Sequence, residues 1–152
     1  MDCRLIERGP VVLQEHDDLG ANRVDRRFML PLGALLVGPV PGDVWAREWH
    51  EPGAPWCWAN CTGVHTLVLL PNGRSFDCDY RASNCGSPDD RVHRCWVKHG
   101  SAATRDLHLS KEGLTCVAGA GSILSHGHGD VSDWHGFLCN FKLVENYEPR
   151  KT

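Results

Sequence analysis

Eight cysteines and nine histidines make metal binding the first chemistry to consider for this chain of 152 residues. Cys57 and Cys61 precede His65 in a C-x3-C-x3-H spacing. Thiolate sulfur and imidazole nitrogen are ligands of tetrahedral zinc sites, and ligands three or four residues apart can turn toward one ion. This spacing predicts that Cys57 and Cys61 bind a metal, with His65 as an alternate ligand.

A second stretch of the same kind runs from Cys85 to Cys95 and contains His93. Closing a tetrahedral site would hold the polar loop between these two cysteines in place. We expect one structural zinc ion per chain, because zinc is redox-inert and accepts both sulfur and nitrogen ligands. The ligands predicted for this single ion are Cys57, Cys61, Cys85 and Cys95, with His65 and His93 as alternates.

The cysteines have two other interpretations. Cysteine is among the most buried residue types, so these thiols can be small apolar core residues. Their even number also permits disulfides, but residues 1–10 (MDCRLIERGP) carry charges and lack the apolar region of a secretory signal. We therefore expect a cytoplasmic location, where a reducing environment disfavours disulfides.

A further group of potential ligands lies in the segment SHGHGD, which contains His126, His128 and Asp130. This segment resembles the His-x-His-x-Asp-His motif of the metallo-β-lactamase superfamily, and the resemblance implies a catalytic metal with an open position. It departs from that motif because Val131 stands where the last histidine belongs. The alternative is a glycine-rich surface turn with solvated histidines.

The C-terminal third contains AGAGSI at 118–123, WHGFL at 134–138 and a following Lys-Leu pair at 142–143. These segments resemble an uncharacterised family of small bacterial and actinobacteriophage proteins. The family has a (Gly/Pro)-Ser-Ile turn, a loop, a His-Gly-(Phe/Trp)-(Leu/Ile) strand and a closing hairpin. The segments CWANCTGVHTLVLLPNG, RASNC and HRCWVKHG resemble its cysteine-rich phage branch. The chain departs from the pattern by its HGHGD insertion and by Asn140-Phe141 in place of Asn-Gly.

The positions shared with that family are Ser122 and His135. Some bacterial relatives lie beside ubiquitin-like conjugation genes, so the resemblance implies a peptidase or isopeptidase. An imidazole within hydrogen-bond reach can activate a serine hydroxyl. The alternative is an ordinary strand start and a packed histidine. An orienting acid would come from Asp130, Asp133 or Glu145, and oxyanion donors would come from the backbone at Gly119 and Gly121.

Short apolar runs separated by turn residues predict a mainly β fold, as a small antiparallel sheet, sandwich or partly open barrel. Pro71-Asn72-Gly73 predicts a hairpin turn between strands at 64–70 and 74–80. One or two helical turns are expected near the N-terminus at 44–50, where apolar spacing fits a helix. The other predicted strands cover residues 94–98, 106–109, 114–117, 122–124 and 136–144.

Length and charge limit the classes of function. A chain of 152 residues predicts a single domain, with residues 1–28 as a loosely packed arm. The net charge of −3 gives no broad attraction to nucleic acid, and the apolar run at 29–40 is too short and too interrupted to span a membrane. We expect a zinc-stabilised phage accessory protein that binds a host or phage protein. The alternatives are a serine hydrolase using Ser122 and His135, or a metal-dependent hydrolase using the HGHGD loop.

Overall fold

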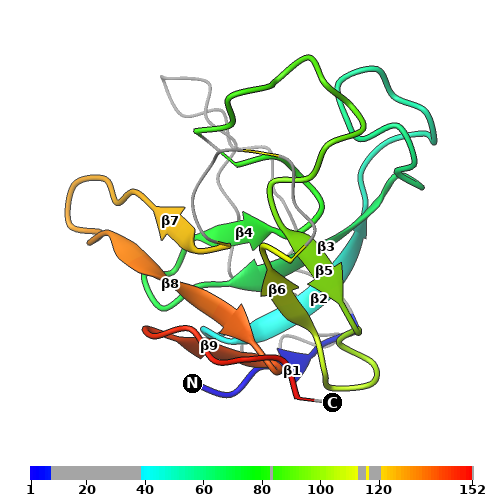
Figure 1. Cartoon of the computed structure of the whole chain (residues 1–152). Coiled ribbons are helices and arrows are strands. Elements are labelled where there is room, and N and C mark those ends of the chain that lie inside the picture. Colours follow the sequence, from blue (N-terminus) through cyan, green and yellow to red (C-terminus); the bar gives the residue numbers. More distant parts are fainter. Residues whose placement is uncertain (8–38, 83, 113–115, 117–120, 152) are drawn as a thin grey trace, which may run out of the picture.

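The chain folds into short strands joined by long loops (Figure 1). The computed structural model describes residues 1–7, 39–82, 84–112, 116 and 121–151. These described residues form three sheets and no helix, which confirms the predicted mainly β fold. The strands are β1 (Arg4–Leu5), β2 (Asp43–Glu48), β3 (Val64–Leu69), β4 (Ser75–Asp77), β5 (Val97–His99), β6 (His108–Ser110), β7 (Ile123–Ser125), β8 (Trp134–Cys139) and β9 (Lys142–Val144).

The largest sheet has the order β1-β2-β3-β4, and its β3–β4 hairpin confirms the turn predicted at Pro71-Asn72-Gly73. The Leu70 N–H donates to the Arg74 carbonyl at 2.8 Å and closes the turn. Gly73 has a φ of 82°, a left-handed conformation that glycine adopts without steric cost. The hairpin therefore follows directly from local turn chemistry.

The helical turns predicted over residues 44–50 are wrong, because residues 44–48 belong to strand β2. Val44 is fully buried in the main core, whereas Trp45 is 3% exposed in a small core on the opposite face. Trp45 pairs with Leu67 across the β2–β3 ladder. When a strand has apolar side chains on both faces, its sequence over seven residues can show the same apolar spacing as a helix. Pairing with β3 therefore decides the conformation of this segment.

The remaining strands form a β5–β6 pair and a β7-β8-β9 sheet, both antiparallel. The β8–β9 hairpin turns at Asn140 and Phe141, whose φ angles are 52° and 62°. Phe141 is buried in the main core, and its N–H donates to the Leu107 carbonyl at 2.8 Å. Core packing therefore holds a bulky residue in a conformation that usually favours glycine.

Most predicted strands correspond to strands of the fold, with bounds that differ by a few residues. The predicted strand at 114–117 and the apolar run at 29–40 lie almost wholly outside the described residues. Of the N-terminal arm, residues 8–28 also lie outside them, whereas β1 pairs with β2 in parallel. None of the described residues forms a helix long and apolar enough to span a membrane.

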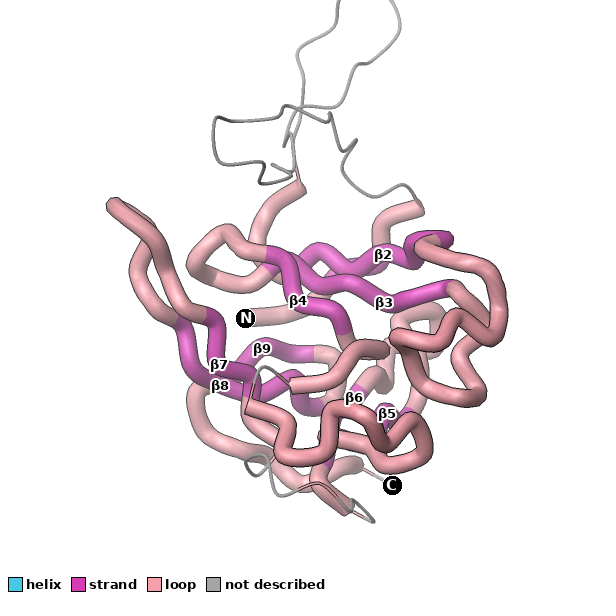
Figure 2. The backbone as a smooth tube through the Cα atoms, turned by 90° about the horizontal axis from the view of Figure 1, so that it is seen from above, coloured by secondary structure: helices cyan, strands magenta, loops and turns pink. Residues whose placement is uncertain are grey.

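Long loops rather than strands carry most of the cysteines and histidines of interest. The loop at 49–63 and the loop at 78–96 contact each other through the Ala59 N–H, which donates to the Arg91 carbonyl at 3.0 Å. Figure 2 shows how much of the chain lies in such loops. In such a structure, side-chain interactions within the loops must stabilise the segments that strand pairing does not hold.

Candidate metal centres

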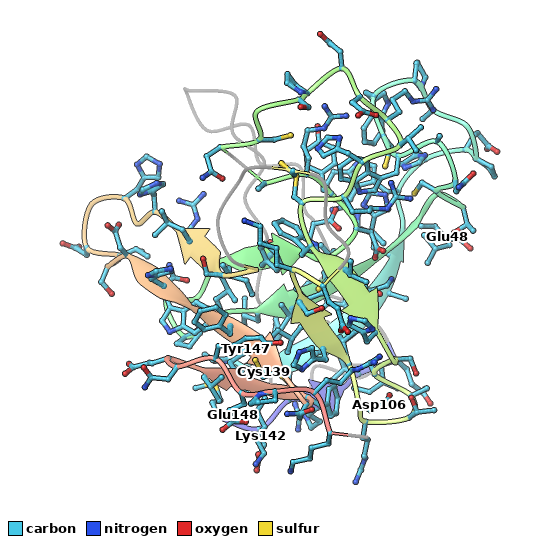
Figure 3. The ribbon with its side chains drawn as sticks, viewed as in Figure 1. Glu48, Asp106, Cys139, Lys142, Tyr147 and Glu148 are labelled. Carbon is cyan, nitrogen blue, oxygen red and sulfur yellow. The ribbon has the colours of Figure 1, made fainter. Side chains whose placement is uncertain are left out.

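Four side chains near the open end of β2 and β3 form the first centre, here called centre A. They are His50, Cys57, Cys61 and His65, and their ligand atoms all lie within 4.8 Å of one another. The His50 and His65 Nε2 atoms are 3.0 Å apart, and the Cys61 Sγ lies 3.2 Å from the His65 Nε2. Figure 3 shows sulfur atoms among the loop side chains on the side where Glu48 is labelled.

Hydrogen bonds fix the orientation of both imidazoles in centre A. The His50 Nδ1 lies 2.7 Å from the Glu51 carbonyl oxygen, and the His65 Nδ1 lies 2.5 Å from an Asp77 carboxylate oxygen. Both oxygens accept, so each Nδ1 carries the proton and each Nε2 directs a lone pair toward the other. Two lone pairs 3.0 Å apart repel unless a cation lies between them. This arrangement fits a metal ion.

The sequence around centre A explains how the ligands converge. Glu48 pairs with Val64 at the end of the β2–β3 ladder, which brings His50 and His65 close together. The Cys61 N–H donates to the Trp58 carbonyl at 3.0 Å, which closes a tight turn that begins directly after Cys57. Backbone pairing and a local turn thus supply two ligands each.

Four side chains from the 78–96 loop and beyond form the second centre, centre B. They are Cys85, His93, Cys95 and Cys116, again with ligand atoms within 4.8 Å of one another. The Cys116 Sγ lies 3.6 Å from the Cys95 Sγ and 3.8 Å from the Cys85 Sγ. Two sulfur atoms each about 2.3 Å from a tetrahedral zinc ion are about 3.8 Å apart, so the spacing fits zinc.

The histidine of centre B has the same orientation as those of centre A. The His93 Nδ1 lies 2.6 Å from the Asp90 carbonyl oxygen, which leaves the Nε2 as the metal-facing atom. That Nε2 lies 3.1 Å from the Cys85 Sγ and 3.7 Å from the Cys95 Sγ. In both centres, therefore, an outer oxygen sets the tautomer that a metal ligand requires.

The buried thiols are poor thiolates without a nearby cation. Burial raises the pKa of Cys57 to about 11 and the pKa of Cys95 to about 12. A bound metal ion reverses this preference, because coordination stabilises the thiolate directly. Metal binding would therefore release protons from both centres.

The structure divides the four cysteines predicted for one ion between two centres. Cys57 and Cys61 belong to centre A, whereas Cys85 and Cys95 belong to centre B. His65 and His93, predicted as alternates, complete these sets together with two residues that the sequence analysis did not select, His50 and Cys116. The physical reason is the fold: each cysteine pair lies nearer to histidines of its own loop and strand than to the other pair.

The two missed ligands differ in how they could have been found. His50 lies in the segment interpreted as helical, and recognition of β2 would have placed it just beyond the end of the β2–β3 ladder, near His65, which pairs with Arg47. Cys116 lies 31 residues after Cys85 along the chain, and no local spacing indicates the contact. Only the tertiary fold brings Cys116 into centre B.

Ser122 directly precedes β7 and His135 lies in the neighbouring strand β8, but the two residues do not form a dyad in this conformation. Ile123 pairs with Gly136 in the β7–β8 ladder, and Ser122 and His135 line one open hollow of about 390 Å³. Among the described residues, no hydrogen bond joins the two side chains. The hollow also contains Gly121, whereas Gly119, the other predicted oxyanion donor, lies outside the described residues.

The acids predicted to orient His135 have other surroundings. Asp133 accepts the Gly127 N–H at 2.7 Å and lies 4.0 Å from the His126 Nδ1. Asp130 and Glu145 are exposed. Within the part of the chain that the structure describes, none of the three contacts His135 by a hydrogen bond or ion pair.

The HGHGD loop does not assemble a metal site among the described residues. His126, His128 and Asp130 are all exposed, and none belongs to a group able to hold an ion. The loop thus differs from centres A and B, whose ligands are buried or half-buried.

Comparisons with known proteins add no family to this description. No protein-family model, no curated protein and no solved structure matches the chain. The geometry of centres A and B is therefore the basis for a function of this chain.

Proposed function

We propose that this protein is a small binding module whose loops are stabilised by two structural zinc ions, one in centre A and one in centre B. The observation that carries the proposal is the pair of complete four-ligand sets, each with its histidine Nε2 atoms directed inward. Four protein ligands leave no position for a substrate, which is typical of structural rather than catalytic zinc. Mixed sulfur and nitrogen donors in tetrahedral spacing favour zinc over magnesium or calcium.

Exposed aromatic side chains beside centre A support a role in protein binding. Trp49 and Trp56 are 45% and 42% exposed, and Tyr80 is 39% exposed. Trp49 stacks on His65 with ring centroids 5.7 Å apart, and Trp56 contacts His50 with centroids 4.5 Å apart. Trp and Tyr are enriched among residues that dominate binding energy at protein interfaces. The zinc ion of centre A would hold these anchors in place through its histidine ligands.

The resemblance to actinobacteriophage proteins makes a host or phage protein in the bacterial cytoplasm the partner we propose. The matched test replaces Trp49 and Trp56 together by alanine. Both side chains are largely outside the core, so the variant should keep its zinc and its fold. The variant should no longer crosslink to the protein partner that the wild-type chain captures in host cells. Equal crosslinking by both proteins would contradict the role of Trp49 and Trp56 in partner binding.

Elemental analysis of protein purified without a histidine tag tests the zinc proposal. We expect about two zinc ions per chain and loss of the folded state on removal by a strong chelator. A metal-free protein that melts cooperatively would contradict the proposal, and iron in place of zinc would contradict the choice of metal. Re-addition of zinc to the chelated protein should restore the native spectrum.

A serine hydrolase is the second candidate, because Ser122 and His135 line the same hollow. Rotation of either side chain would be needed to form the hydrogen bond of an active dyad. In this case Ser122→Ala should keep both zinc ions and the melting temperature but abolish ester or peptide turnover. Unchanged turnover in that variant would exclude Ser122 as the nucleophile.

A further inference from the structure

We propose that the hollow between β4, β7 and β8 binds a small molecule that carries a phosphate group on an aromatic body. The hollow has a volume of about 390 Å³, within the range of small-molecule sites. It is defined by an apolar floor and a rim of hydrogen-bond donors. This proposal goes beyond the binding-module function, because it concerns a small ligand in a hollow that is lined by Tyr80 but not by Trp49 or Trp56.

Aromatic side chains form the floor of the hollow. Phe76 and Trp96 line it with ring centroids 5.1 Å apart, and Ile123 packs beside them. The Trp96 indole donates to the Cys78 carbonyl at 2.8 Å, which fixes the orientation of the ring. A flat aromatic body would bury apolar area against this floor at low cost in conformational entropy.

Hydrogen-bond donors of several kinds surround that floor. Arg81, His126, His135 and Ser122 all line the hollow. Among the described residues, Arg81 forms no ion pair, and its guanidinium carbon lies 5.4 Å from the centroid of the Trp58 ring. A guanidinium group, two imidazoles and a hydroxyl on one rim favour an anion with several acceptor oxygens.

The one carboxylate among the described residues that line the hollow does not oppose an anionic ligand. Asp77 lines the hollow, but its side chain accepts the Nδ1–H of His65 and the Asp79 N–H. The Asp77 carboxylate is thus hydrogen-bonded to His65, a residue of centre A. Within the described part of the chain, Arg81 is the cationic side chain that lines the hollow and forms no ion pair.

The loop that presents His126 is anchored before any ligand binds. Arg74 donates to the His126 carbonyl at 2.8 Å, and the Asn72 amide donates to the Ser125 hydroxyl at 3.1 Å and to the Ser132 carbonyl at 3.2 Å. The β3–β4 turn therefore holds both ends of the β7–β8 loop. His135 lies within strand β8 itself, opposite Leu124. Such anchoring reduces the entropy lost on binding.

The first experiment titrates phenyl phosphate into the full-length, zinc-loaded protein and follows the Trp96 indole N–H and the His135 ring by NMR. We expect saturable shifts at both groups, weaker binding of inorganic phosphate, and no saturable binding of benzylamine, which has the opposite charge. Adenosine monophosphate and O-phosphotyrosine, titrated separately, distinguish a nucleotide from a phosphorylated amino acid as the source of the phosphate.

The variants Arg81→Gln and His135→Gln should each weaken phenyl phosphate binding at least tenfold. The matched control is His128→Gln, which lies in the same loop as His126 but does not line the hollow. Absence of saturation in the wild type, equal binding of benzylamine, or equal affinity in all three variants would overturn the proposal. Zinc content, measured on every sample, shows whether the two centres are intact independently of this result.

Discussion

His65 and Asp77 form a buried pair in which the Nδ1 of the imidazole lies 2.5 Å from a carboxylate oxygen. His65 is fully buried, and the side chain of Asp77 is 17% exposed. Burial raises the pKa of Asp77, although the hydrogen bond from His65 opposes the shift. The pair connects strand β4 with centre A and sets the tautomer of a proposed zinc ligand.

Replacement of Asp77 by asparagine should weaken zinc binding at centre A by about 10- to 100-fold, the usual effect of losing an outer partner of a ligating histidine. Competition with a chromogenic chelator measures the affinity of each centre. Centre B should be unchanged. Asp89→Asn, an exposed carboxylate outside both centres, is the control and should match the wild type.

Loss of Cys116 should remove the ion from centre B alone. Cys116→Ala leaves three ligands and should lower the free energy of unfolding by at least about 3 kcal/mol, since structural zinc binding contributes directly to folding. Cys78→Ala is the matched control, because Cys78 is equally buried but belongs to neither centre. It should cost about 1 kcal/mol and keep two zinc ions. Equal zinc content in both variants would contradict the role of Cys116.

Acid should weaken the attachment of the C-terminal segment through His108. The His108 Nδ1 accepts the Asn140 N–H at 3.2 Å, and its Nε2 donates to the Tyr147 hydroxyl at 3.2 Å. Burial, together with the charges of His99 and Arg150, lowers the pKa of His108, whereas Glu112 opposes the shift. Figure 3 labels Tyr147 beside Cys139, on the side of the molecule away from Glu48.

A lowered folded-state pKa means that neutral His108 stabilises the fold above about pH 6.5, the ordinary value for histidine. This contribution is lost as the pH falls from that value through the folded-state pKa, because the unfolded chain binds the proton first. NMR titration of the ring should give a pKa below 6.5 and the Nε2–H tautomer. A pKa at or above that value would contradict the effect of burial.

Replacement of Phe141 by glycine should destabilise the fold, even though glycine suits the turn better. Relief of the left-handed conformation gains about 1–2 kcal/mol. Loss of a buried phenylalanine side chain costs about 3–5 kcal/mol. The net loss should therefore be about 2 kcal/mol, measured by urea unfolding of the zinc-loaded protein. Asn140→Gly removes no core side chain, although it removes the amide that bonds Pro149 and Lys151.

Local signals in the sequence were sufficient for the fold class and for three of the four ligands of centre A. Alternating apolar residues and the Pro-Asn-Gly turn predicted β3 and β4, since both depend on neighbouring residues. Cys57, Cys61 and His65 share a short spacing for the same reason. The segment at 44–50 was misassigned because helix and strand give similar apolar patterns over seven residues.

Long-range contacts account for what sequence reasoning did not find. Centre B includes Cys116, whose Sγ lies 3.8 Å from the Cys85 Sγ although the two residues are 31 positions apart along the chain. The hollow beside Ser122 likewise combines residues from three separate hairpins and loops. Spacing along the chain carries no information about such contacts.

The two centres also differ in the length of chain that each one closes. His50 and His65 in centre A are 15 residues apart, whereas Cys85 and Cys116 in centre B are 31 residues apart. Each doubling of a flexible loop adds about 0.6 kcal/mol to its closure entropy. An ion should therefore cross-link the shorter loop first during folding, and the ordered β2–β3 hairpin then provides a surface on which the longer loop closes. The availability of the metal should thus affect the order in which the loops fold as well as the stability of the folded state.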